Sequence, residues 1–287
     1  MKAIFKRELA SYFNNMTGYI FTAFTIFIIG IYVMYYCLKS GYSYFEYVVS
    51  NIEFFYLMTI PVLTMKVVAE DKKQRTDQLL YSLPLSMSQI VIGKFLSMAI
   101  VLLLPVIELI FLPPILNIYG NVPFGTAYSS IFVYYMLGLA LIAIGLFISS
   151  LTDNQLAAAA ITFIIVLISY LMSGLSSYIP GDSLSSYISF AVIILLAGII
   201  IWLMIKNITV SFLISAAAEG MLLIVYITKK TVFEGLIHKV ISNISLFDKS
   251  ENFFQGIFDL TSVVYFISVI LLFIFLTIQS MEKRRWS

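Results

Sequence analysis

The sequence predicts an all-α membrane protein with about eight transmembrane helices. Of its 287 residues, 61% are hydrophobic and only 11% are charged, whereas soluble domains are about half apolar and about a quarter charged. The apolar residues are gathered into runs, and several runs approach the roughly 20 residues that a helix needs to cross a bilayer. Together, composition and run length indicate one multi-pass domain over residues 1–287.

The composition argues against several other classes of protein. A formal net charge of +2 with scattered basic residues does not suit nucleic-acid binding. Cys37 is the only cysteine and His238 the only histidine, which excludes an internal disulfide and argues against a zinc site or a histidine-paired nucleophile. Counting alone does not exclude a carboxylate pair, but no strong catalytic set is present. We therefore expect no enzymatic activity and no cofactor or metal in this chain.

Eight segments are apolar enough to span. The first is expected to remain as a helix, because the stretch before it includes Glu8 and no small-residue cleavage site follows. Lys206 and Asn207 divide a long apolar stretch, which at about 1.5 Å per residue is two spans rather than one. The predicted spans are 18–38, 53–68, 93–116, 128–151, 155–179, 186–205, 208–228 and 260–280.

Charge placement predicts the orientation. With eight spans and the N-terminus in the cytoplasm, twelve Lys and Arg residues lie inside and five outside, as the positive-inside bias requires. Both termini are then cytoplasmic. A count of seven or nine spans would place the basic C-terminal end outside and weaken this bias.

The segment 1–15 is expected to form an interfacial amphipathic helix. Phe5, Leu9, Tyr12 and Phe13 recur at helical spacing, with basic residues elsewhere around the helix. Such a helix can be a positive-inside anchor or a specific docking element, and the sequence leaves both interpretations open.

The cytoplasmic segment 70–84 is longer than a reversal of the chain requires, since about five residues suffice for that. Its periodicity predicts a short two-faced helix that ends at Pro84. Ser86 then begins the next helix in a capping box with Gln89. The apolar face would carry Thr76, Leu79, Leu80 and Leu83, and the other sides Lys72, Lys73, Arg75 and Asp77.

A second, shorter turn is expected on the same side of the membrane. It consists of Thr152, Asp153, Asn154 and Gln155. Thr152 is expected to cap the following helix and to form a capping box with Gln155. Residues 151 and 156 would form the hydrophobic staple around this cap. Four polar residues that merely reverse two helices need no partner, so a plain turn is the alternative to a contact role.

Several motifs occur together along the chain. They are Glu70-Asp71-Lys72-Lys73, Thr76-Asp77-Gln78-Leu79-Leu80, Leu83-Pro84-Leu85, Ile90-Val91-Ile92-Gly93-Lys94, the run 143–155 and the tail from 256 to 286. These motifs resemble the signature of ABC-2 type transporter permeases, most closely the gliding-motility and copper-maturation branch. The resemblance covers residues 1–180 and 230–287, whereas 182–230 departs from the six-span core of the family and looks like two inserted spans. Members of the family often have Gly where this chain has Arg75.

The resemblance implies that 70–84 is a coupling helix seated in a groove of a separate ATP-binding-cassette ATPase, which would bind ATP and Mg. The only Gly-Lys pair here, Gly93-Lys94, is followed by Phe95 and is no phosphate-binding loop. A second permease copy or paralogue, a bacterial cell membrane and export are implied as well. Without the resemblance, a helix lying on lipid would be an equal alternative. The implied docking residues are Glu70, Asp71, Lys73, Arg75, Thr76, Asp77, Leu79, Leu80 and Leu83.

Two acidic residues fall inside predicted spans. Glu108 and Glu219 are functional candidates, because an ionised carboxylate at mid-bilayer costs about 2.5 kcal/mol or more. Alternatively each is protonated or hydrogen-bonded to a neighbouring span, such as the one with Ser169 and Ser173. Gly138 and Gly145 indicate helix packing.

The segment 231–259 is long, aromatic and outside in the predicted topology. Phe247, Phe253 and Phe258 suggest one or two helices in the outer interface, either an anchor or a gate over an exit path.

Two other classes of function remain to be weighed. An ATP-independent secondary carrier or channel would show intramembrane charges repeated in two halves, and Glu108 and Glu219 lie in no evident repeat. A membrane enzyme would need a clustered catalytic set near one interface. The substrate is not readable, because an aromatic lining would suit a lipid, peptide, polysaccharide or drug.

Overall fold

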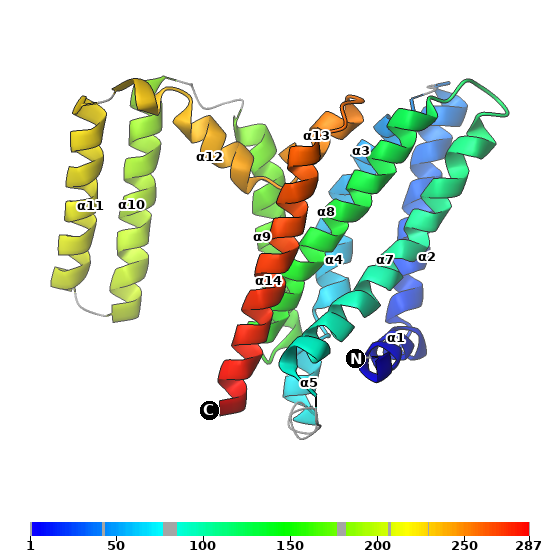
Figure 1. Ribbon diagram of the computed structural model, residues 1–287, viewed down its shortest axis with the longest axis horizontal. Helices are drawn as coiled ribbons and strands as arrows, with labels where there is room; N and C mark the ends of the chain where they lie inside the picture. The colour runs from blue at the N-terminus through cyan, green and yellow to red at the C-terminus, as the bar shows by residue number, and fades with distance from the viewer. Residues whose placement is uncertain are drawn as a thin grey trace. The chain divides into compact units, whose positions relative to one another are not determined.

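The computed structural model describes residues 2–41, 44–76, 85–176, 182–205, 208–228 and 230–286. Within these residues the secondary structure is helical, without a strand. The chain forms two compact units, Met1–Ile168 with Phe247–Ser287, and Ser169–Leu246 (Figure 1). Helix α9 (Gln155–Ser176) begins in the first unit and ends in the second.

Among the residues that the structure describes, six helices are long and apolar enough to cross a membrane, which confirms a multi-pass protein. The two expected spans in 182–230 are present as helices, α10 (Ser183–Ile205) and α11 (Ile208–Thr228). Their apolar stretches among the described residues are shorter, Ser183–Val192 and Ser215–Thr228, so eight spans stays a prediction. The six candidate spans are Thr17–Lys39, Glu46–Lys73, Met87–Leu116, Phe124–Leu151, Gln155–Met172 and Leu260–Arg285.

The second span is assembled from several short helices and is longer than the predicted 53–68. It begins at Glu46, and residues 45, 48, 49 and 52 are fully buried at helical spacing. The two acids Glu46 and Glu53 lower the local hydropathy, so hydropathy alone does not reveal this first part of the span. Pro61 lies inside α4 without ending it. The pieces are α3 (Glu46–Ile52), the 3-10 turn η2 (Glu53–Phe55), α4 (Tyr56–Thr64) and α5 (Ala69–Lys73).

Helix α8 is the centre of the first unit. It packs against α3, α4, α5, α7, α13 and α14. Small residues permit this: a Cβ added at Gly138 would lie 2.7 Å from the Tyr56 hydroxyl oxygen, and one at Gly145 would lie 2.8 Å from the Thr64 Cβ. The predicted packing role of both glycines is thus confirmed. The elements are α7 (Met87–Leu116), α8 (Phe124–Leu151), α13 (Asp248–Phe254) and α14 (Leu260–Trp286).

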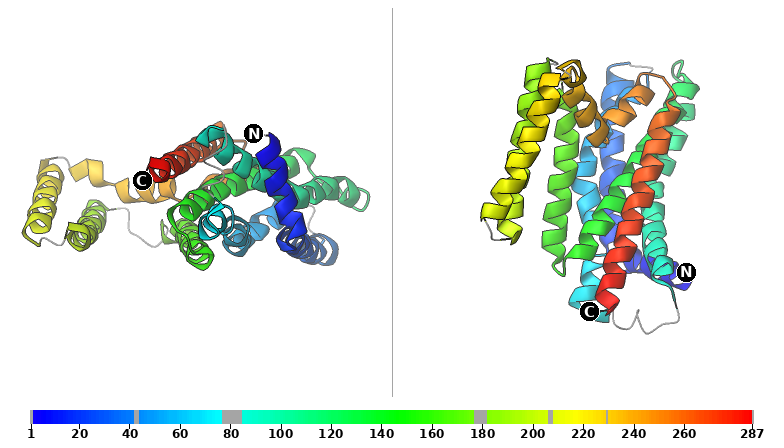
Figure 2. Two further views of the ribbon diagram at one scale, coloured as in Figure 1. Left: turned by 90° about the horizontal axis from the view of Figure 1, so that it is seen from below. Right: turned by 60° about the vertical axis from the view of Figure 1, so that its left-hand side comes forward.

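The first helices meet at a corner. Helix α1 (Lys2–Asn14) lies across the end of α2 (Thr17–Val33), which continues as the π-helical turn η1 (Met34–Lys39) (Figures 1 and 2). The buried face of α1 carries Ile4, Glu8 and Tyr12. Tyr12 makes a specific contact here, since its hydroxyl donates to the carbonyl of Leu63 at 2.8 Å. The interfacial position of α1 stays a prediction.

The second unit is a small helical layer. Helix α10 packs on α11, on the 3-10 turn η3 (Lys230–Phe233) and on α12 (Leu236–Ile244). An aromatic cluster joins them, with ring centroids of Tyr187 and Tyr226 4.7 Å apart and those of Tyr226 and Phe233 5.5 Å apart. The segment 231–259 therefore contains two helices, α12 in this unit and α13 in the first.

Candidate functional site

Two clusters of ion pairs lie at one end of the helix bundle of the first unit. Helix α1, the short helix α5, the first turns of α7 and the last turns of α14 lie at this end (Figures 1 and 2). Helix α5 leads into the segment for which the sequence predicts a coupling helix. Two clusters of ion pairs hold α5, one on each side.

The first cluster centres on Lys94 in α7. Its side chain is fully buried, and its ammonium group donates to Asp71 Oδ2 at 2.6 Å, to the Val67 carbonyl at 2.6 Å and to Glu8 Oε1 at 3.0 Å. These three acceptors use all three N–H groups of a lysine. Lys94 therefore joins α1, α5 and the turn before α5 through one fully satisfied centre.

Arg7 completes the balance of charge in this cluster. Its guanidinium pairs with Glu8 and lies 3.8 Å from Asp71 Oδ2. Two cations, Arg7 and Lys94, thus face two carboxylates. A buried charge is stable only when it is paired and hydrogen-bonded, so each of the three elements depends on the others. Nearby, burial raises the pKa of the Tyr12 phenol, whose hydroxyl donates to the α4 backbone at Leu63.

The break between α4 and α5 is held by α8. The Ser149 hydroxyl oxygen accepts from the backbone N–H groups of Val68 at 3.2 Å and Ala69 at 3.1 Å, and it lies 3.3 Å from the Met65 carbonyl as a donor. These contacts satisfy backbone groups that the helix break leaves open. The position of α5 is therefore fixed relative to α8.

The second cluster lies on the other side of α5. Lys72 is buried and donates to the Ser150 carbonyl, and its Nζ lies 3.8 Å from Asp153 Oδ1. Arg284, near the end of α14, pairs with the same carboxylate oxygen at 2.7 Å. The Ser280 hydroxyl also donates to the Ser150 carbonyl, at 3.4 Å. Asp153 therefore links α5 to the C-terminal end of α14.

The turn before α9 differs from its prediction. Helix α9 begins at Gln155, and Asn154 rather than Thr152 caps it, because Asn154 Oδ1 accepts from Leu156 N at 2.9 Å and from Ala157 N at 3.5 Å. Thr152 Oγ1 instead accepts from Asn154 N at 3.1 Å. In contrast, the predicted cap at the start of α7 is confirmed: Ser86 accepts from Gln89 N.

The predicted docking residues are only partly described. Gln74 donates to Glu70 Oε1 at 3.0 Å, and Thr76 donates to Asp71 Oδ1 at 3.0 Å. Lys73 is exposed. Residues 77–84 lie outside the described residues, and with them Asp77, Leu79, Leu80 and Leu83.

The predicted helix over 70–84 is interrupted in its described part, and the stretch 77–84 lies outside the described residues. Helix α5 ends at Lys73, and Arg75 has φ 58, in the left-handed region that a helix interior excludes. Glycine would adopt this positive φ without steric cost. The sequence signal was the charged run 70–75, which lacks an apolar face of its own.

Of the two acids singled out in spans, neither lies in a cluster. Glu108 Oε2 and Glu219 Oε1 are buried without a hydrogen-bond partner among the described residues. Ser169, the suggested partner of Glu108, instead accepts from Leu246 N at 3.1 Å, and its carbonyl accepts from Ser245 at 3.1 Å. A contact of Glu108 or Glu219 with substrate stays untested.

Sequence reasoning missed two other acids. Glu46 and Glu53 are 7% and 5% exposed, at the end of the second span away from α5. Glu53 Oε2 lies 3.2 Å from the Ser250 hydroxyl of α13, which joins this span to the segment 231–259. The signal was their spacing of seven residues within an apolar run, which places both on one helix face.

Lys94, Glu8 and Lys72 were also missed as site residues. Lys94 and Glu8 could have been found as charged residues among apolar neighbours near a span end, because such a residue needs a partner. Lys72 stands in the charged stretch 70–75 and carries no such signal. Among the residues that the structure describes, no group of three or more His, Cys, Asp and Glu could hold a metal ion.

The fold and the charged end define a multi-pass helical membrane domain in which ion pairs hold α5 at one end of the bundle. A family model described as ABC-2 family transporter protein matches residues 38–195, more than half of the chain. The chain therefore belongs to the ABC-2 transporter family and is a membrane-embedded permease component. No match was found among curated proteins.

Proposed function

We propose that this chain is the membrane-spanning subunit of an ATP-driven exporter and is coupled to a separate ATP-binding-cassette ATPase. ATP and Mg would bind to that partner, and this chain would carry no catalytic residue. Membership of the ABC-2 family supports the proposal, because permeases of this family generally pair with an ATPase subunit. The observation that supports the coupling role most directly is that two ion-pair clusters hold α5, one around Lys94 and one around Asp153. We call these two clusters the clamp.

The clamp offers a path for movement. A displacement of the loop after α5 acts on α1 and α7 through Lys94 and on α14 through Asp153. The same span continues to Glu53, whose contact with Ser250 reaches α13. A docking event at one end of the span therefore has a chain of direct contacts to the other end.

The proposal includes finer features from the sequence. These are eight spans with the pair 182–230 inserted, cytoplasmic termini, a second permease copy or paralogue, a bacterial cell membrane and kinship with the gliding-motility and copper-maturation branch. The substrate is left unspecified.

Orientation is testable by cysteine labelling in a Cys37-free background. A cysteine at Asp248 should react with an impermeant maleimide in intact cells, whereas one at Arg75 or Trp286 should react only after lysis, because the positive-inside bias places these ends in the cytoplasm. Cysteines at Asp182 and Asn207 should lie on opposite sides. Labelling at Arg75 in sealed cells would contradict the orientation.

Docking is tested by Leu80→Asp. If Leu79, Leu80 and Leu83 fill a groove on the ATPase, a carboxylate at position 80 is buried in an apolar contact, and affinity should fall about a hundredfold or more. The matched control is Lys73→Ala, on the exposed rim, which should cost no more than about 1 kcal/mol.

The measurement is co-purification of the ATPase with each variant at equal membrane expression, with ATP hydrolysis assayed alongside. Equal recovery of the ATPase by wild type and both variants would refute docking through this face. An ATP-independent carrier would show no co-purifying ATPase with any of them.

A further inference from the structure

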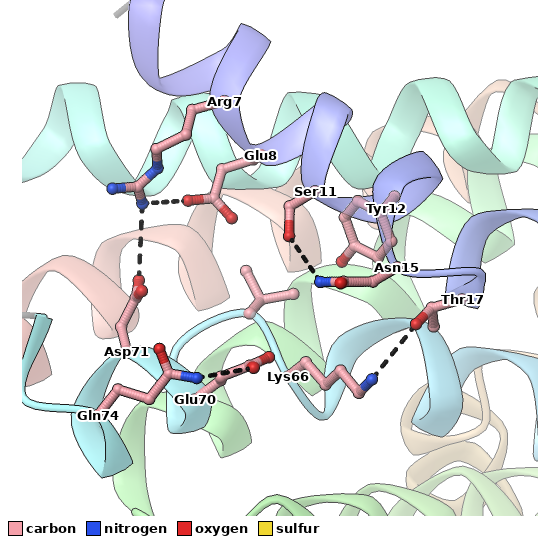
Figure 3. A pocket seen from close by; sticks show the side chains of 11 residues that line it. Arg7, Glu8, Ser11, Tyr12, Asn15, Thr17, Lys66, Glu70, Asp71 and Gln74 are labelled. Carbon is pink, nitrogen blue, oxygen red and sulfur yellow. Dashed lines mark hydrogen bonds and ion pairs between the residues drawn. The ribbon is translucent and has the colours of Figure 1, made fainter.

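A polar pocket lies beside the Lys94 cluster, between α1 and the end of the second span. Its volume is about 400 Å³, and Figure 3 shows its lining side chains. Tyr12 and Val67 form a buried floor, at 7% and 5% exposure. Ser11, Asn15 and Gln74 are exposed and form the rim. The pocket lies wholly within the first unit.

The depth of the pocket in the membrane follows from its lining. Thr17 lines it and is the first residue of the span Thr17–Lys39, and Lys66 and Glu70 line it in the last turns of the span Glu46–Lys73. Both spans therefore leave the hydrocarbon at the pocket. A bilayer is about 40–45 Å thick in total, and the layer just outside its hydrocarbon core contains the lipid headgroups. The pocket therefore lies at the depth of the headgroups.

Some of the charged side chains that line the pocket form ion pairs, and others form only hydrogen bonds to neutral groups. Glu8 and Asp71 are engaged by Lys94 and Arg7. Lys66 and Glu70 form no ion pair with each other: the Lys66 ammonium donates to Thr17 Oγ1 at 3.3 Å, and Glu70 accepts from Gln74 at 3.0 Å (Figure 3).

Lys66 lies in the break between α4 (Tyr56–Thr64) and α5 (Ala69–Lys73), whereas Glu70 lies in α5. The Lys66 ammonium is directed to Thr17 and the Glu70 carboxylate to Gln74. One cation and one anion thus face a single cavity without neutralising each other. A ligand with a phosphate and an ammonium a few bonds apart would match both.

We propose that this pocket binds the headgroup of an ethanolamine phospholipid. The phosphate lies against Lys66, with the hydroxyls of Ser11 and Thr17 and the amide of Asn15 as further donors. The primary ammonium donates to Glu70. A choline headgroup has no N–H to donate, and a glycerol headgroup has no cation for Glu70, so both bind less well. The bound lipid fastens α1 to the second span.

The test uses the full chain in nanodiscs of equal parts phosphatidylethanolamine, phosphatidylcholine and phosphatidylglycerol, with bound lipid measured by native mass spectrometry. Wild type should retain the ethanolamine lipid over the other two. Lys66→Gln and Glu70→Gln should each lower that retention about tenfold, because each removes one charged hydrogen bond. Glu70→Gln keeps an acceptor for Gln74, so the helix is not disturbed.

Lys6→Gln is the matched control, since Lys6 is exposed on α1 and does not line the pocket; it should retain the lipid as wild type does. Equal retention of the three lipids by wild type, or undiminished retention by both pocket variants, would overturn the proposal. Soluble phosphoethanolamine is added to lipid-depleted protein as a second arm. If it binds as tightly as the lipid, the lipid source is wrong and the ligand is a soluble phosphoamine.

Discussion

Replacing Lys94 with methionine is expected to lower the free energy of unfolding by about 3–5 kcal/mol, the usual cost of breaking a buried ion pair from one side. Methionine fills a similar volume but donates no hydrogen bond. Glu8 and Asp71 would then be buried with only the half-exposed Arg7 as counter-charge. Thermal unfolding in detergent, followed by size-exclusion chromatography, measures the loss.

Two further variants separate charge from packing. Lys6→Met makes the same substitution at an exposed site on α1 and should change stability by no more than about 0.5 kcal/mol. Adding Glu8→Gln and Asp71→Asn to Lys94→Met should recover a large part of the loss, because the uncompensated charges are then removed. If Lys94→Met is as stable as Lys6→Met, the cluster does not hold this end of the bundle together.

The spans were largely predictable because each depends on a local property, a run of apolar residues. The exception is instructive. The second span was placed too short because Glu46 and Glu53 interrupt its hydropathy, and only the fold brings Ser250 to Glu53. A contact between residues 197 positions apart leaves no mark on a local window. The inserted pair 182–230 is helical as predicted, yet its crossing of the membrane stays a prediction.

The candidate site was predictable in location but not in chemistry. The charged run 70–75 indicated the loop, whereas the residues that hold it, Lys94, Ser149 and Arg284, come from three helices far away in the sequence. A sequence shows that a buried charge needs a partner. It does not show which one, and Asp153 illustrates this: expected in a plain turn, it pairs with both Lys72 and Arg284.

The backbone at Arg75 shows a different limit. The spacing of apolar residues predicted a helix through this position. Arg75 instead has a left-handed backbone, with φ 58, and changes the direction of the chain after α5. Single-residue backbone states at non-glycine positions carry only weak sequence signals.

Substituting Gly145 with leucine is expected to destabilise the first unit by about 3 kcal/mol or more, at the upper end for overpacked cores. A Cβ at this position would already lie 2.8 Å from the Cβ of Thr64 in α4, and the rest of the leucine side chain would need further space between α4 and α8. Thr64 cannot retreat, because it is fully buried, β-branched and donates to the Ile60 carbonyl at 2.9 Å. Thermal unfolding in detergent measures the loss.

Because α4 leads through the Ser149 contacts into α5, a displacement of α4 should also reduce ATPase stimulation in Gly145→Ala, a milder change that leaves the protein folded. Gly30→Ala is the matched control: nothing lies within 4 Å of a Cβ added there, and alanine in a helix interior should be favoured by about 0.5–1 kcal/mol over glycine. The same substitution thus has opposite expected signs at positions 30 and 145. If both alanine variants gain stability, the close approach of α4 and α8 at Gly145 is not what sets the position of α5.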